Sequence, residues 1–135
     1  MPILHIVRGL PGSGKTTATR KLAAETGAIL IDPDALLVQG GEYRWSPERF
    51  ESAKYFAGEM MASAARMDAD IIYADVLPKR DEVYALLAWV RSARKFYDLK
   101  VYDLKITVEE SKKRNIHNVR AEDIERMARE WEDWQ

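Results

Sequence analysis

The chain has 135 residues and a formal net charge of −1, with 47% hydrophobic and 32% charged residues. This indicates one ordinary globular domain, residues 1–135, and the near-neutral charge means that any contact with an anionic polymer needs a local basic patch. The lack of cysteine excludes disulfides and thiolate metal sites, and no apolar run reaches the roughly 18 residues of a membrane span, so we expect a cytoplasmic protein with neither signal peptide nor membrane contact.

The first predicted element is a strand over residues 3–7, a continuous apolar run typical of a parallel strand covered on both faces. It leads into the sequence RGLPGSGKTT, residues 8–17, which contains the pattern G-x-x-x-x-G-K-T. Glycines let the backbone N–H groups of such a loop point inward at a triphosphate, and the following helix adds free N–H groups. We expect Lys15 to reach the β- and γ-phosphates and the Thr16 hydroxyl to hold Mg²⁺. The residues predicted to contact the nucleotide here are Gly9, Pro11, Gly12, Ser13, Gly14, Lys15, Thr16 and Thr17.

Helices and short strands alternate after this loop. A helix over residues 16–25 is predicted to end at Gly27, and a short strand follows over residues 28–31. Ser46 and Pro47 provide an N-cap and a first helical residue. The apolar residues that follow repeat at helical spacing, which predicts a stripe facing the core. That stripe consists of Phe50, Ala53, Ala57, Met60, Ala64 and Met67.

The second half of the chain continues the alternation. We predict a strand over 70–75, a helix over 81–95 and a strand over 100–104, and a capping box at 107–110 opens another helix. The chain ends in an amphipathic helix whose apolar positions are Ile124, Met127, Ala128 and Trp131. Strands separated by helices, with a phosphate-binding loop after the first strand, predict a three-layer α/β P-loop fold with a mainly parallel sheet. Ligands of such sheets bind at the carboxyl ends of the strands.

Three acids follow the ends of predicted strands and should converge on the loop. Asp32 and Asp34 follow the second strand, and Asp75 ends the third with the character of a Walker B acid. A kinase needs one carboxylate to deprotonate an attacking hydroxyl and another to hold Mg²⁺ or its waters. We assign these roles to Asp34 and Asp75, and interpret Asp32 as a turn residue before Pro33, although Asp34 could instead cap a helical turn. The D-x-D pattern of haloacid dehalogenase-like phosphatases is a weaker interpretation, because these acids accompany a P-loop lysine.

A basic cluster lies between Ser111 and Met127 and includes Lys112, Lys113, Arg114 and Arg120. Such clusters are often solvated surface. In a kinase, however, an arginine from a mobile lid neutralises charge on the transferring phosphoryl group and excludes water. We therefore predict an α-helical lid in this segment.

These motifs together resemble the kinase domain of phage polynucleotide 5′-hydroxyl kinase and related small single-domain P-loop kinases. The resemblance rests on GLPGSGKTT, on the spacing from the lysine to Asp34, on Asp75 at a strand end, and on RNIHNV before the last helix. It implies that Asp34 is the general base and that Arg114 is the lid arginine. The chain departs from the family pattern at Leu37, where an arginine is expected, at Val76-Leu77, and at Asn118 and Arg120 in the lid.

Several other residues have two interpretations each. His117 lies in the lid motif and either touches the nucleotide or serves the structure. Tyr43 and Trp45 follow Gly40-Gly41 and either stack on a base or pack against the fold. His5 is expected to be a packed strand residue, and Trp131 and Trp134 are expected to dock the terminal helix.

We therefore predict an ATP- and Mg²⁺-dependent kinase with catalytic residues Lys15, Asp34 and Arg114. Arg114 and His117 complete the nucleotide contacts, and Thr16 and Asp75 are the expected metal ligands. The expected acceptor is the 5′-OH of a single-stranded or end-exposed nucleic acid. A small-molecule kinase, for a metabolite or sugar nucleotide, and a nucleotide-binding module with weak ATPase activity are the alternatives.

Overall fold

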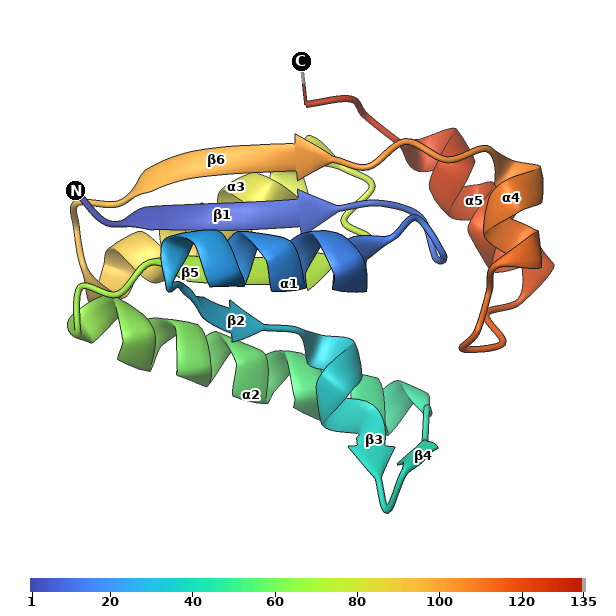
Figure 1. Ribbon diagram of the computed structural model, residues 1–135, viewed down its shortest axis with the longest axis horizontal. Helices are drawn as coiled ribbons and strands as arrows, with labels where there is room; N and C mark the ends of the chain where they lie inside the picture. Colours follow the sequence, from blue (N-terminus) through green and yellow to red (C-terminus); the bar gives the residue numbers. More distant parts are fainter. Residues whose placement is uncertain (135) are drawn as a thin grey trace.

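The computed structural model describes residues 1–134, and its centre is a parallel sheet of four strands in the order β2-β5-β1-β6 (Figure 1). The strands span Ile29–Ile31 (β2), Ile71–Asp75 (β5), Ile3–Arg8 (β1) and Asp98–Asp103 (β6). β1 and β5 are buried along most of their length, since helices cover both faces of the sheet. The predicted three-layer α/β fold with a parallel sheet is therefore confirmed.

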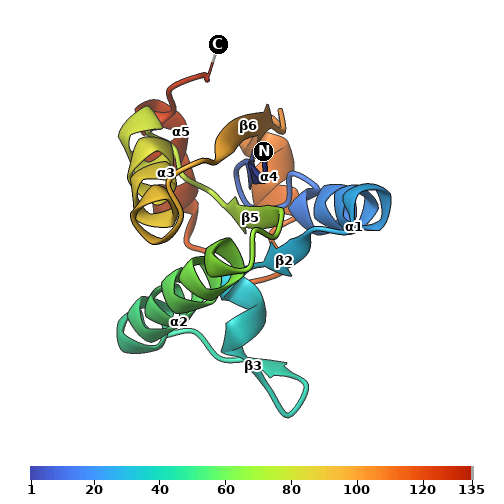
Figure 2. The ribbon, with the colours of Figure 1, turned by 90° about the vertical axis from the view of Figure 1, so that its left-hand side faces the viewer.

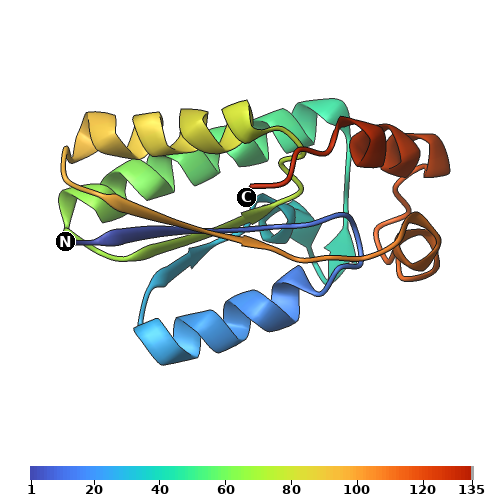
Figure 3. The same ribbon diagram turned by 90° about the horizontal axis from the view of Figure 1, so that it is seen from above.

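Helices form the two outer layers (Figures 2 and 3). Helix α1 (Lys15–Thr26) packs on β1, β2 and β5 from one side, while α2 (Pro47–Arg66) and α3 (Arg80–Ala93) lie together on the other. Two short helices, α4 (Val108–Lys113) and α5 (Ala121–Glu130), pack on each other beyond the carboxyl ends of the strands (Figure 1). This position agrees with the predicted lid segment. Within residues 1–134, no helix is both long and apolar enough to cross a membrane.

The helix boundaries follow local signals in the sequence. Gly27 ends α1 with φ +71°, a left-handed conformation that glycine adopts without strain. The Ser46 side chain accepts a hydrogen bond from the Arg49 N–H at 3.1 Å, and Pro47 is the first residue of α2. Thr107 caps α4 in the same way through the Glu110 N–H. Helix α3 ends at Ala93 rather than at residue 95, because Arg94 has an extended backbone.

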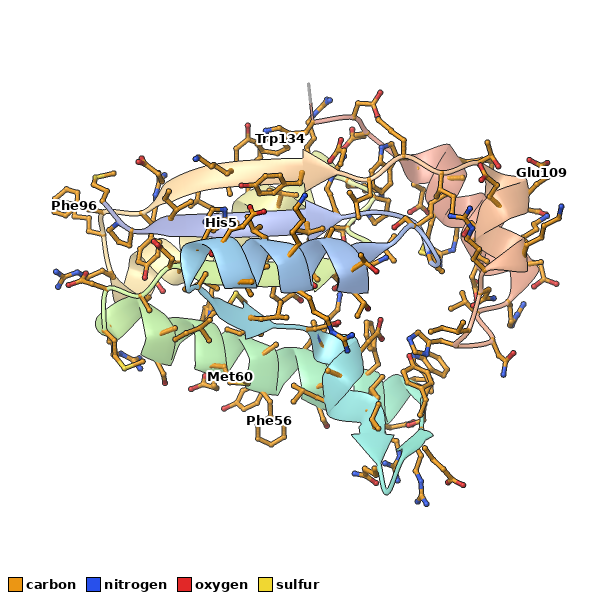
Figure 4. The ribbon with its side chains drawn as sticks, in the orientation of Figure 1. His5, Phe56, Met60, Phe96, Glu109 and Trp134 are labelled. Carbon is orange, nitrogen blue, oxygen red and sulfur yellow. The ribbon has the colours of Figure 1, made fainter. Side chains whose placement is uncertain are left out.

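The predicted core stripe of α2 is only partly correct. Ala53, Ala57 and Ala64 are buried, but the Met60 side chain is 42% exposed and Met67 is 66% exposed. Figure 4 shows Phe56 and Met60 pointing away from the sheet. Small residues and one methionine form the buried face instead, and they let α2 approach the sheet and α3 closely. These residues are Ala53, Ala57, Met61, Ala62, Ala64 and Ala65.

An insertion between β2 and α2 carries three short elements that were not predicted from the sequence. A short 3₁₀ helix, η1 (Pro33–Leu37), is followed by a hairpin of β3 (Val38–Gln39) and β4 (Glu42–Tyr43). The hairpin turn consists of Gly40 and Gly41, which have φ of +59° and +81°. Two positive φ angles are what a tight hairpin turn requires, so the G-G pair was the available signal. Through η1 the insertion packs on α2, beside the carboxyl ends of the strands.

Candidate active site

The loop between β1 and α1 has the geometry of a phosphate cradle. Gly12 and Gly14 have φ of +76° and +95°, which only glycine adopts freely, and Gly14 is the N-cap of α1. No side chain caps this helix N-terminus, so its first N–H groups are free to bind an anion. The Ser13 hydroxyl oxygen is buried and has no hydrogen-bond partner among residues 1–134. An orphaned buried hydroxyl beside a free helix N-terminus fits the binding of phosphate oxygens.

Lys15 extends along this loop. Its ammonium group donates hydrogen bonds to the Gly9 carbonyl at 2.7 Å and the Leu10 carbonyl at 3.2 Å. Burial lowers the pKa of Lys15, while the nearby carboxylates of Asp75, Asp34 and Asp32 raise it in opposition. The lysine and the three acids named from the sequence therefore share one electrostatic environment.

Asp32 and Asp34 have different partners. The Asp32 carboxylate accepts a hydrogen bond from the Asp34 N–H at 3.0 Å and caps η1, in agreement with its interpretation as a turn residue. Burial, followed by repulsion from Asp34, raises the pKa of Asp32. Asp34 does not cap the turn, because its Oδ1 accepts a hydrogen bond from the Tyr43 hydroxyl at 3.0 Å.

Asp75 lies at the end of β5 with both carboxylate oxygens engaged. Oδ1 accepts a hydrogen bond from the Val76 N–H at 2.8 Å, and Oδ2 accepts one from the Tyr73 hydroxyl at 3.3 Å. The Lys54 ammonium, from α2, is 3.2 Å from the same Oδ2. Burial and the Asp75 charge raise the pKa of Tyr73. Tyr73 and Lys54 were not predicted from the sequence, although Tyr73 precedes Asp75 by the two-residue period that places side chains on one face of a strand.

Thr16 and Asp75 are the expected metal ligands, and the Thr16 side chain is exposed at the start of α1. Residues 1–134 contain no group of three or more histidines and acids arranged to hold a metal ion. A site of two protein ligands still fits Mg²⁺, since this ion commonly keeps several waters and binds substrate phosphates.

The lid segment rests directly on the phosphate cradle. The buried Ser111 hydroxyl of α4 donates a hydrogen bond to the Pro11 carbonyl at 2.6 Å. A Cβ placed on Gly12 would lie 2.7 Å from the Cβ of Arg114, so only glycine permits this approach. The Arg114 guanidinium is turned outward, with its side chain 62% exposed and its Nη2 3.5 Å from Glu110. The backbone of Arg114 therefore lies against the cradle, whereas its guanidinium forms an exposed ion pair with Glu110.

The lid also reaches across to the hairpin. The His117 imidazole stacks on the Tyr43 ring with 4.0 Å between the centroids and 25° between the planes. Asn115 closes the lid loop by bonding both the N–H and the carbonyl of Val119. His117 is therefore held over the residue that binds Asp34. Trp45, beside Tyr43, is 55% exposed.

Most cations of the basic cluster predicted between Ser111 and Met127 have acidic partners. Lys112 pairs with Glu125 at 2.5 Å, and Arg120 pairs with Glu122 at 3.2 Å. On the hairpin, Arg44 pairs with Glu42 at 3.2 Å. Most of the basic cluster therefore consists of surface ion pairs, and these do not form a continuous positive surface.

The other predicted roles are structural and are confirmed. His5 lies on β1 (Figure 4), where it is buried. Its Nδ1 is 2.9 Å from the Tyr102 hydroxyl. Trp134 packs against the hydrophobic core. The Arg8 guanidinium carbon lies over the Trp131 ring, 4.3 Å from the centroid of that ring. Arg8, for which the sequence predicted no role, is fully buried.

Comparison with known proteins places the fold of the chain among those of P-loop kinases. The chain is 22% identical to a chain of the Pnkp1/Rnl/Hen1 RNA repair complex with a TM-score of 0.72, and 19% identical to a gluconokinase from Sinorhizobium meliloti 1021 with a TM-score of 0.61. The alignments cover 96% and 98% of this chain, and 43% and 76% of those chains. At these identities the likeness shows a shared fold.

Sequence comparison gives the family. Uncharacterized protein PM0531 of Pasteurella multocida (strain Pm70) is 39% identical over 71 residues, which cover 47% of this chain and 40% of that protein. The chain thus spans less than half the length of this relative and of the RNA repair chain. A family model described as an AAA domain (AAA_33) matches residues 4–135. This match covers nearly the whole chain, which therefore belongs to the AAA_33 family of AAA domains.

Proposed function

We propose that the protein transfers the γ-phosphoryl group of ATP to a hydroxyl acceptor, with Mg²⁺ as cofactor. One observation carries this proposal. Lys15, the lysine of the phosphate cradle, lies near enough to the three strand-end acids for their charges to raise its pKa. Phosphoryl transfer needs positioning, positive charge at the phosphates and a carboxylate for the acceptor proton, and these residues provide all three.

Each residue has a defined task in this proposal. The free N–H groups of the loop and of α1 bind the phosphates, and Lys15 exchanges its two carbonyl contacts for phosphate oxygens. The Asp34 carboxylate takes the acceptor proton as the acceptor oxygen bonds to the γ-phosphorus and ADP leaves. Thr16 and Asp75 would hold Mg²⁺, which neutralises phosphate charge when bound. Arg114 turns inward from Glu110 to the transferring group, as a lid arginine does.

The acceptor that we propose is the 5′-hydroxyl end of a polynucleotide. Its support is Trp45, which lies beside Tyr43 in the sequence and is exposed, so that its ring offers a face on which a base can stack. The fold shared with a chain of an RNA repair complex agrees with this choice.

A small-molecule acceptor is the second candidate, and the paired cations favour it. A polynucleotide backbone would have to compete with Glu122, Glu125 and Glu42 for the arginines and lysines near the site. The fold shared with a gluconokinase agrees with this alternative.

Transfer of labelled γ-phosphate to a panel of DNA, RNA and metabolite hydroxyls tests both candidates. We expect label on a 5′-hydroxyl oligonucleotide with a KM that rises with salt, because backbone binding releases counterions. A KM indifferent to salt, or transfer to a metabolite alone, would replace the polynucleotide by the small molecule. Slow ATP hydrolysis without transfer to any hydroxyl would identify a nucleotide-binding module instead.

Lys15→Ala is the matched control for this assay. The Lys15 ammonium donates its hydrogen bonds to two loop carbonyls, so the variant should keep its fold and melting temperature while transfer falls by at least about 10²-fold. A folded Lys15→Ala protein with normal transfer would contradict the kinase proposal.

A further inference from the structure

The Tyr43 hydroxyl is hydrogen-bonded to the carboxylate that we propose as the general base. It donates a hydrogen bond to Oδ1 of Asp34 at 3.0 Å, and Asp34 is the proposed general base. An acceptor hydroxyl must lie within hydrogen-bond reach of that base before its proton can be taken. Tyr43 thus presents an acceptor-type hydroxyl to the base from within the chain.

The surroundings of Tyr43 hold this arrangement in place. The ring stacks on His117 of the lid, which keeps the phenol between the hairpin and the lid. Burial and the Asp34 carboxylate raise the pKa of Tyr43, so the hydroxyl is protonated and needs a base to become a nucleophile. Asp32 and Asp75 also act on this hydroxyl, and the same two acids act on the Lys15 ammonium. The phenol and the lysine therefore share the same three acidic neighbours, Asp32, Asp34 and Asp75.

We propose that Tyr43 is an internal phosphoryl acceptor, which the enzyme phosphorylates when no external acceptor displaces it. The inference rests on the proposed function, since it uses the same ATP site and the same base. The phenol oxygen bonds to the γ-phosphorus of ATP, the bond from that phosphorus to the bridging oxygen breaks, ADP leaves, and the phenol proton goes to Asp34. The products are phosphotyrosine and ADP.

Other hydroxyls near the site are less suited to this reaction. Tyr73 also donates to a carboxylate, that of Asp75, but its side chain is almost fully buried in the core. The Ser111 hydroxyl is buried and donates to the Pro11 carbonyl. Tyr43 is only half-buried and belongs to a short hairpin with a Gly40-Gly41 turn, so it can move as a phosphate is added.

Phosphorylation of Tyr43 would move the modified side chain away from the active site. A phosphotyrosine carries about −1.5 to −2 charges at neutral pH, and here it would face Asp32, Asp34 and Asp75. Repulsion from these acids should drive the modified side chain off Asp34 and open its stack on His117. The expected modification is therefore a single phosphate per chain that is added slowly and not removed by the same site.

Mass spectrometry of the protein after incubation with Mg·ATP alone tests the inference. Trypsin cleaves after Lys21 and Arg44, and the peptide between them contains Thr26 and Tyr43 as its only hydroxyl side chains. We expect one phosphate on Tyr43, with a first-order rate that does not depend on protein concentration, as transfer within one molecule requires. Tyr43→Phe should lose this label completely, and Asp34→Asn should slow it by about 10²- to 10⁴-fold.

Tyr55→Phe is the matched control, because Tyr55 is an exposed tyrosine on α2 and its loss should leave the label unchanged. Wild-type protein that phosphorylates an external hydroxyl but never Tyr43 would overturn this inference and leave the proposed function intact. A labelling rate proportional to protein concentration would overturn the intramolecular step. Wild-type protein that labels neither Tyr43 nor any external hydroxyl would overturn both proposals.

Discussion

Asp32 and Asp34 lie two residues apart, yet their contacts assign them to different tasks. Asp32 is turned toward its own backbone, where it caps η1, whereas Asp34 is turned toward Tyr43 and the hairpin. Asp34→Asn keeps the shape and the acceptor oxygen for Tyr43 but removes the base, so we expect kcat to fall by about 10²- to 10⁴-fold with little change in ATP affinity. Asp32→Asn keeps the cap and should cost far less activity. Steady-state kinetics that show the reverse order would exchange the two roles.

The raised pKa of Asp32 also predicts a pH dependence of stability. Its carboxyl group holds a proton more tightly in the folded than in the unfolded state, where 3.8 is the ordinary value. The stabilisation is therefore present below this value and is lost as pH rises through the folded pKa. The charges that face Asp32 are Asp34, Asp75 and Lys15. In urea unfolding between pH 4 and 7, Asp32→Asn should gain stability relative to wild type as pH rises, and a constant difference would contradict the raised pKa.

The sequence predicted the positions of some residues of the site but not of others. The loop residues were recognisable because a triphosphate imposes one spacing on glycine, lysine and threonine. Lys54 was not, because its approach to Asp75 depends on how α2 packs across the sheet. The same packing turned Met60 outward and put Met61 into the core. Helical spacing gives a face only to within about one residue, so such details need the tertiary structure.

At the scale of elements, the contact between α4 and the phosphate cradle is specific to glycine. Gly12→Ala would place a Cβ 2.7 Å from Cβ and 3.0 Å from the carbonyl oxygen of Arg114, so α4 must move away. Gly27→Ala is the matched control, because Gly27 also has a positive φ but has open space around it. The control should lose about 1–2 kcal/mol of stability through backbone strain and keep its activity.

For Gly12→Ala we expect a larger loss of stability together with a strong loss of transfer. Hydrogen exchange should show faster opening of residues 108–113 in Gly12→Ala than in Gly27→Ala. Equal exchange in the two variants would mean that the lid does not depend on this contact.

Most of the elements were predictable from the sequence, and the exceptions are η1 and the hairpin of β3 and β4. Caps at Ser46 and Thr107 and the stop at Gly27 marked helix ends because these signals act within a few residues of sequence. The hairpin of β3 and β4 was missed since each strand has only two residues, too few for any alternation to be visible. Tyr43 of this hairpin stacks on His117, which lies far along the chain. A contact between two distant loops produces no periodic pattern in the sequence.

At the scale of the whole molecule, Arg8 joins segments from four parts of the chain. Its guanidinium donates to both carboxylate oxygens of Asp103 on β6, to the Leu77 carbonyl after β5, and to the Glu132 carbonyl of the C-terminal segment. The register of the sheet places Arg8 opposite Asp75 on one side and Asp103 on the other. The order of strands was not predicted, so this junction could not be foreseen from an arginine at the end of an apolar run.

Arg8→Ala should therefore lower the free energy of unfolding of the whole domain. Breaking a buried ion pair by removing one partner costs about 3–5 kcal/mol, and here the Arg8 side chain is fully buried and the Asp103 side chain is 12% exposed. Asp103→Ala should be costly too, and the double variant should lose less than the sum, since both changes remove the same contacts. Arg94→Ala is the control: its pair with Asp68 is at 2.7 Å but both side chains are about half exposed, so we expect a loss of about 0–1 kcal/mol. Urea unfolding of all four variants measures these differences, and equal losses for Arg8→Ala and Arg94→Ala would show that Arg8 does not hold the C-terminal segment to the sheet.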